Sequence, residues 1–277
     1  MVVIGAFILP HGPIILNPSK EGIPSSAKKI HYAMLEASKH IEQLEPDIVF
    51  LTTPHSIALS HNFGIYLNRA GKGNASWEGE YEDYEIEIDF AQSLAIELVD
   101  CLQEKELAVN GITAFSSGMN APLRWAEVVP LWFLKKVPTK TKYLLLSQPI
   151  RPFISPPLDR IPELKKLGTN LKSYFDFLAE KVVVIISADL AHTHTEDAPY
   201  GFSETAEPFD ELMENWAVSL NEELLLKKAL PLLDQAMCCG YYGFIILQSM
   251  LKKTNFTPRV IIRATPSYYG MMVVEYL

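Results

Sequence analysis

The segment 182-VVVIISADLAH-192 joins a β-branched apolar run to a polar stretch that ends in a histidine. A run of this kind is typical of a strand covered on both faces of a sheet, and comparable runs predict strands over residues 2–9, 48–53 and 142–147. Apolar residues at spacings of three to four predict helices over residues 25–44, 90–104, 164–180, 209–220 and 241–251. This alternation indicates an α/β protein, a three-layer α/β/α domain with a central mixed or mostly parallel sheet.

The chain is predicted to be a single domain over residues 1–277. The glycine-rich stretch 68–80 is predicted to be a long loop or a hairpin turn. Residues 148–162 contain five prolines and are predicted to cross the surface irregularly. Neither stretch has the length or flanking composition of a linker between independent domains.

Composition excludes several classes of protein. The 277 residues include 24 basic and 33 acidic side chains, and the net charge of −9 argues against broad binding to nucleic acids or anionic membranes. No apolar stretch approaches the roughly 18 residues of a spanning helix. The three cysteines, Cys101, Cys238 and Cys239, are too few for a disulfide framework. We therefore expect a cytoplasmic protein.

Three histidines lie just after predicted strands. His11 follows the strand 2–9, His55 follows the strand 48–53, and His192 ends the segment 182–192. Ligands of open α/β sheets bind beyond the carboxyl ends of the strands, so parallel neighbouring strands would bring these imidazoles together. Histidine is the commonest metal ligand and the usual acid–base group near neutral pH. His31 and His40 fall within a predicted helix, where we expect them on its solvated face.

At these residues the chain resembles the LigB superfamily, the class III extradiol ring-cleavage dioxygenases and their Memo-like relatives. The resemblance rests on the order and spacing of short pieces along nearly the whole chain: Pro10-His11-Gly12, Thr53-Pro54-His55, Val129-Pro130-Leu131, Ser187 to His192, Asp197 to Gly201, Pro208-Phe209-Asp210, Cys239-Gly240-Tyr241 and Ser267 to Gly270.

The resemblance implies a specific chemistry. Family enzymes hold a non-haem Fe(II) with two histidines and one glutamate, and leave positions open for a catecholic substrate and O2. By position, His11 and His55 would be the histidine ligands, and His192 the catalytic acid–base residue. Asp189 would either orient this loop or cap the following turn. The resemblance also implies a homodimer and a role in the breakdown of aromatic compounds.

The chain departs from the family pattern at two positions. Cys238 stands where the glutamate ligand is expected, and Trp125 stands where many members have a histidine. The predicted ligand set is therefore His11, His55 and Cys238. Fe(II) is the expected metal, and a thiolate ligand makes Zn or Cu the alternatives.

The identity of the third ligand stays open in the sequence. Cys239 could ligate in place of Cys238, Cys238 could be a small apolar packer, and Glu275 could supply a carboxylate. Memo-like members also lack the glutamate and carry a cysteine near glycine. Two functions follow from the resemblance: ring cleavage of a catecholic compound, or a Memo-like protein that binds a metal or a partner without ring cleavage. A third alternative is hydrolase-like or other rearranged metal chemistry at the same site.

The surroundings of the predicted site also allow two interpretations. Arg124 is either a positive charge for a carboxylated aromatic substrate or an ordinary surface residue. Trp77, Trp125 and Trp132 either line an aromatic pocket or belong to the core.

Overall fold

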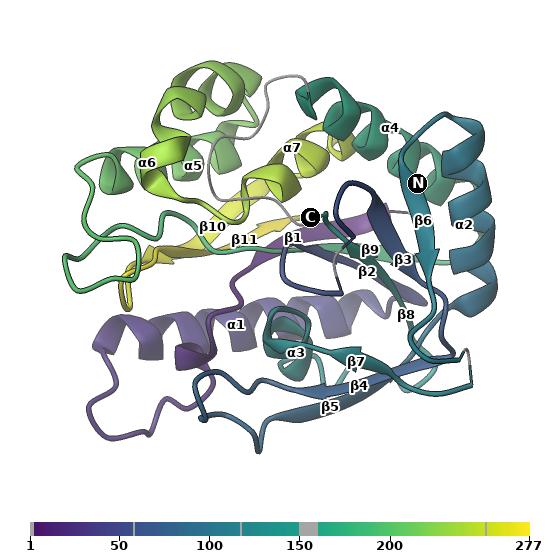
Figure 1. The fold of residues 1–277 in the computed structure, drawn as a ribbon, viewed down its shortest axis with the longest axis horizontal. Helices are drawn as coiled ribbons and strands as arrows, with labels where there is room; N and C mark the ends of the chain where they lie inside the picture. Colours follow the sequence, from purple (N-terminus) through teal and green to yellow (C-terminus); the bar gives the residue numbers. More distant parts are fainter. Residues whose placement is uncertain (1–2, 58, 117, 150–159, 253) are drawn as a thin grey trace.

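The computed structural model describes residues 3–57, 59–116, 118–149, 160–252 and 254–277. Within them, the main sheet has eight strands in the order β10-β11-β1-β9-β2-β8-β3-β6 (Figure 1). Their bounds are β1 Val3–Leu9, β2 Ile48–Thr53, β3 Phe63–Tyr66, β6 Val109–Ile112, β8 Lys142–Ser147, β9 Val182–Ser187, β10 Pro258–Ala264 and β11 Met271–Tyr276.

The four strands at the centre of the sheet, β1, β9, β2 and β8, are parallel neighbours. On one side of them, β11 and β10 pair in antiparallel fashion, and on the other side β3 pairs antiparallel to β8. The sheet is therefore mixed with a parallel centre. Its central strands are the four apolar runs found in the sequence, although Val2 lies outside the described residues.

Helices cover both faces of this sheet, because alternate residues of the central strands face opposite cores. In β9, Val182, Val184 and Ile186 pack into one core, whereas Val183 and Ile185 pack into the other. Figure 1 shows the resulting layers. The first core is closed by α2 (Gln92–Glu104), α4 (Ile161–Phe177), α5 (Ala206–Ser219) and α7 (Tyr241–Met250), and the second by α1 (Ser25–Leu44) and α3 (Trp125–Trp132).

The predicted α/β architecture, with a mixed and largely parallel sheet between helices, is thus confirmed. The five predicted helices correspond to α1, α2, α4, α5 and α7, with ends that differ by a few residues. The proline-rich crossing at 148–162 lies largely outside the described residues. Among the residues that the structure describes, no helix has the length and apolar character needed to span a membrane.

Part of the stretch 68–80 is a strand, which corrects the prediction for residues 70–74, whereas residues 75–80 lie in the connection between two antiparallel strands, as a hairpin turn would. Residues Ala70–Asn74 form β4, which lies between β5 (Glu85–Asp89) and β7 (Ala121–Leu123) in a small second sheet. The glycines of β4 allow a close approach of backbones: a Cβ on Gly73 would lie 2.1 Å from the carbonyl oxygen of Leu123.

His31 is buried, so the expectation of a solvated position was wrong for this residue. Its Nδ1 lies 2.8 Å from the carbonyl oxygen of Ile15, and its ring packs against that of Phe133. His40 is partly buried, and its Nδ1 lies 2.7 Å from a carboxylate oxygen of Glu275. That carboxylate also accepts a hydrogen bond from Arg259 of β10. Glu275, which lies on β11, therefore connects α1 to the strands β10 and β11.

Candidate active site

The candidate site lies at the carboxyl ends of three adjacent parallel strands, β1, β9 and β2. His11 and His55 follow β1 and β2 by two positions, and Asp189 follows the strand between them by the same number. The rings of His11 and His55 are 5.1 Å apart, edge to face. Both rings and His192 line one cavity of about 570 Å³. The predicted convergence of the three histidines is therefore present in the structure.

A cysteine joins the two histidines, but it is Cys239 and not Cys238. One ligand atom each from His11, His55 and Cys239 lie within 4.8 Å of one another. The Sγ atom of Cys239 is 3.5 Å from Nε2 of His11. Both thiols lie near the carbonyl oxygen of Asp189, Cys238 at 3.5 Å and Cys239 at 3.6 Å, but only Cys239 belongs to the cluster with the two histidines. The cysteine that lies with the two histidines is therefore Cys239, and not Cys238, which was predicted from the sequence.

A backbone turn determines which of the two cysteines faces the histidines. The short helix α6 (Leu233–Ala236) ends at Met237, which has a left-handed φ of 57°. The chain then passes so close to β9 that a Cβ on Gly240 would lie 2.5 Å from Cβ of Ala188. Glycine at this position therefore permits the approach that brings the thiol of Cys239 to the site.

Ser187 fixes the protonation pattern of His11. Its hydroxyl donates to the carbonyl oxygen of Ala126 at 2.5 Å, and its oxygen is 3.0 Å from Nδ1 of His11. A hydroxyl has one proton to donate, so Nδ1 of His11 carries the proton of this second bond. The lone pair of His11 is consequently on Nε2, the nitrogen that faces Cys239.

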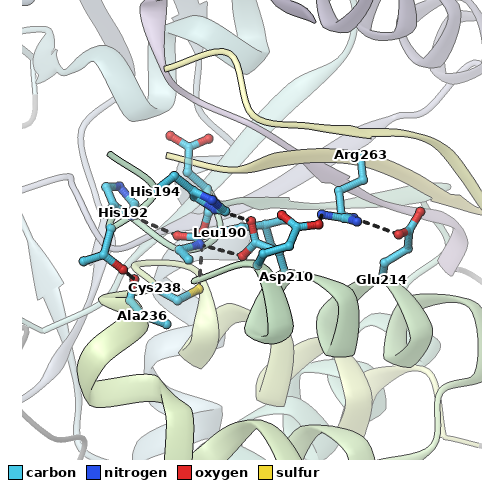
Figure 2. A network of polar contacts seen from close by, with 12 residues as sticks. Leu190, His192, His194, Asp210, Glu214, Ala236, Cys238 and Arg263 are labelled. Atoms are coloured by element: carbon cyan, nitrogen blue, oxygen red, sulfur yellow. Dashed lines mark hydrogen bonds and ion pairs between the residues drawn. The ribbon is translucent and has the colours of Figure 1, made fainter. Parts of the chain in front are cut away.

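A hydrogen bond at Nδ1 also determines the tautomer of His192. Its Nδ1 is 2.8 Å from the carbonyl oxygen of Leu190, which can only accept, so the lone pair lies on Nε2. Its backbone N–H donates to the carbonyl oxygen of Ala236 at 2.7 Å (Figure 2). Its ring stacks on that of Tyr269, with 5.5 Å between centroids. The side chain is thus fixed in position and tautomer.

Asp210 holds the loop on both sides of His192 (Figure 2). One oxygen of this fully buried carboxylate accepts from the backbone N–H of Ala191 at 2.9 Å. The other lies 2.9 Å from Nε2 of His194. Beyond it, Arg263 is held between two glutamates of α5. No role for Asp210 was predicted from the sequence, although the residue belongs to the Pro208-Phe209-Asp210 piece of the family resemblance.

Asp189 lies beside His11 and does not cap the following turn with its side chain. One of its oxygens accepts from the backbone N–H of His11 at 3.0 Å, and the other is 3.4 Å from Nε2 of that histidine. Burial raises the pKa of Asp189 to about 6. The carboxylate therefore orients the loop that carries His11, whereas the sequence predicted that it would orient the loop of His192 or cap the following turn.

Burial also keeps the imidazoles of the site neutral. It lowers the pKa of His11 to about 3 and that of His192 to about 4. The pKa of His55 is also lowered, by burial and by repulsion from the other two histidines. Burial raises the pKa of the Cys239 thiol, so this donor would lose a proton on binding a metal.

Aromatic side chains form the walls of the cavity. Trp77 and Trp125 are among them, and Trp125 stacks on His55 with centroids 5.4 Å apart. Trp132 is not among the residues that line this cavity, and it packs against Tyr84. The exposed guanidinium of Arg124 lies 5.0 Å from the ring of Trp125. The tyrosines at 200, 268 and 269 also line the cavity. Periodicity gave no sign of them, because they lie in irregular loops.

The donor atoms suit a transition-metal ion. Bonds of about 2.0 Å to nitrogen and 2.3 Å to sulfur in a tetrahedral site place the two ligand atoms about 3.5 Å apart. The distance between Nε2 of His11 and Sγ of Cys239 has this value. Two neutral imidazoles and a thiol therefore form a donor set that fits a metal, with the soft ligand favouring Zn or Cu.

Comparison with known proteins identifies the family of the chain and similar folds. A family described as the catalytic LigB subunit of aromatic ring-opening dioxygenase matches residues 5–236, which include the three histidines but not Cys239. Protein CA_C1420 of Clostridium acetobutylicum is 24% identical over the whole chain, which spans 57% of that relative's length. The fold resembles that of the uncharacterized protein JW3007 from Escherichia coli K12, with a TM-score of 0.59, 13% identity and 98% of each chain covered. The chain therefore belongs to the LigB family.

Proposed function

We propose that this protein is a metal-dependent dioxygenase that opens the ring of a catecholic substrate with O2. The observation that carries the proposal is the convergence of His11, His55 and Cys239 beside a cavity that also contains His192, in a chain of the LigB family. His11, His55 and Cys239 would hold the metal. The chemistry that a bound metal supplies is Lewis acidity toward a substrate hydroxyl and a shared binding point for both reactants.

His192 would act as the acid–base residue of the reaction. Its low pKa keeps the ring neutral at pH 7, and its Nδ1 is occupied by the carbonyl of Leu190, so Nε2 would accept the proton of a substrate hydroxyl. The same nitrogen would return the proton later in the reaction. Stacking on Tyr269 limits rotation of the ring, which favours transfer at one atom.

The aromatic walls would orient the substrate ring and exclude water from it. The volume of about 570 Å³ is in the range of small-molecule sites. Two of the lining rings stack on the histidines, Trp125 on His55 and Tyr269 on His192. A flat aromatic ring would fit against such surfaces.

The proposal is tested by metal content and oxygen consumption after anaerobic purification. The wild type should hold close to one metal ion per chain, and His11→Ala should lose it. His192→Gln should keep the metal and lose catechol-dependent oxygen uptake by about 10²- to 10⁴-fold. His40→Gln, a histidine outside the cavity, serves as the matched control. A wild type that binds no metal after reconstitution with Fe(II) would contradict the proposal.

Cys239 favours a second candidate function, a metal-binding protein without ring cleavage. A thiolate is easily oxidised and prefers Zn or Cu to an oxygen-activating Fe(II). The same purification separates the two candidates. Zinc or copper that is lost in His11→Ala, with no oxygen uptake on any catechol after Fe(II) reconstitution, would support the second.

A further inference from the structure

A buried carboxyl group outside the cavity connects the loop that follows His55 to the start of α3, whose Trp125 stacks on His55. Glu127 lies in the first turn of α3 and is completely buried. One of its oxygens accepts from the hydroxyl of Tyr66 at 2.8 Å. The other accepts from the backbone N–H of Arg124 at 2.7 Å. Each of these two bonds leads toward His55 by a different route.

The first route runs through the loop that follows His55. The hydroxyl of Tyr66, at the end of β3, donates to Glu127 and accepts from the backbone N–H of Ile57 at 3.0 Å. Ile57 is two residues beyond His55. The carboxylate therefore sets the direction of the tyrosine hydroxyl, and the hydroxyl fixes the loop.

The second route runs through the start of α3. The bond from the backbone N–H of Arg124 to Glu127 fixes the residue that precedes Trp125. The indole of Trp125 stacks on the imidazole of His55 at an interplanar angle of 29°. One carboxylate thus restrains both the chain that carries His55 and the ring against which His55 packs.

Helix capping alone does not account for this arrangement. A glutamate at the third helical position often accepts the bond from the residue before the helix, and it can do so in full contact with water. Burial of a carboxyl group is costly, and here it raises the pKa of Glu127 to about 7. The second oxygen, bonded to Tyr66, is the part of the arrangement that capping does not require.

We propose that Glu127 is a positioning residue for His55, acting through Tyr66 on one side and through the start of α3 on the other. The proposal rests on the proposed function in one respect, since it takes His55 to be a metal ligand. Tyr66→Phe cuts the first route and leaves the ring and the helix cap in place. Glu127→Gln keeps the shape but offers one acceptor oxygen to two donors.

Co(II) affinity and the Co(II) absorption spectrum provide the test. We expect Tyr66→Phe and Glu127→Gln to bind Co(II) at least 10-fold more weakly than the wild type, with altered ligand-field bands, as for other residues that orient ligands. Glu275→Gln is the matched control, because it also removes a buried carboxylate with two partners, but on β11. It should lower the melting temperature and leave affinity and spectrum unchanged. Wild-type affinity and spectrum in Tyr66→Phe would overturn the proposal even if Glu127→Gln does not fold.

A measurement on the metal-free protein separates this proposal from the proposed function. The imidazole signals of His55 in nitrogen-15 NMR spectra should broaden or shift in Tyr66→Phe and remain as in the wild type in Glu275→Gln. A wild type that binds no Co(II) would contradict the metal site, and the His55 signals would then decide the positioning role. An unchanged His55 signal in Tyr66→Phe would refute that role.

Discussion

Substitution of Ser187 by alanine tests how the protein prepares His11 for a metal. The hydroxyl of Ser187 is completely buried, and its removal leaves the carbonyl of Ala126 and the Nδ1–H of His11 without their partner. Each buried group left in this state costs about 1–3 kcal/mol, so the loss at two groups should lower the free energy of unfolding of Ser187→Ala by about 2–6 kcal/mol. Loss of the bond that holds Nε2 toward the site should also weaken metal binding by about 10- to 100-fold.

The assay combines urea unfolding with zinc binding measured by competition with a chelator. Ser249→Ala is the matched control, because Ser249 is also buried but lies on α7 against Gly168 of α4. Long-range nitrogen-15 correlation spectra should show the proton of His11 on Nδ1 in the wild type and a mixture of tautomers in Ser187→Ala. Wild-type zinc affinity in Ser187→Ala, together with an unchanged tautomer, would refute this reasoning.

Three further substitutions have defined outcomes. Gly240→Ala places a Cβ 2.5 Å from Cβ of Ala188, so it should displace Cys239 and lower both the melting temperature and zinc affinity; wild-type zinc affinity would contradict this. Asp210→Asn leaves one acceptor oxygen for two donors and should lower the free energy of unfolding in urea by about 1–3 kcal/mol. An unchanged free energy of unfolding would count against the role of Asp210. Burial raises the pKa of Glu127 from 4.5 to about 7, so between these pH values the folded state keeps a proton that the unfolded state releases. The free energy of unfolding should therefore fall by roughly 3 kcal/mol as the pH rises from 4.5 to 7. Glu127→Gln should remove this part of the pH dependence of unfolding, and an identical profile in both proteins would contradict it.

The central sheet and its helices could be predicted because their sequence patterns follow from burial. The apolar runs at 48–53, 142–147 and 182–187 form strands with the predicted bounds, since a strand covered on both faces is apolar along most of its length. The convergence of His11 and His55 followed from the same reasoning. Each histidine comes directly after such a run, and parallel strands end at one edge of the sheet.

Features set by long-range contacts could not be predicted. The strand Ala70–Asn74 has no apolar alternation, and it forms because its glycines accept a neighbouring backbone at close range. The choice between Cys238 and Cys239 depends on the left-handed turn at Met237, for which the sequence gives no glycine or asparagine signal. His31 is different, because it lies on the helix face that Ile30 and Met34 share, and that face is apolar.

The near-ultraviolet spectrum of the Co(II)-loaded protein shows whether a cysteine sulfur binds the metal. A thiolate bound to Co(II) gives an intense charge-transfer band, whereas imidazole ligands alone do not. We expect this band in the wild type and in Cys238→Ser, and its loss in Cys239→Ser. A band that persists in Cys239→Ser, or that disappears in Cys238→Ser alone, would contradict a metal site formed by His11, His55 and Cys239.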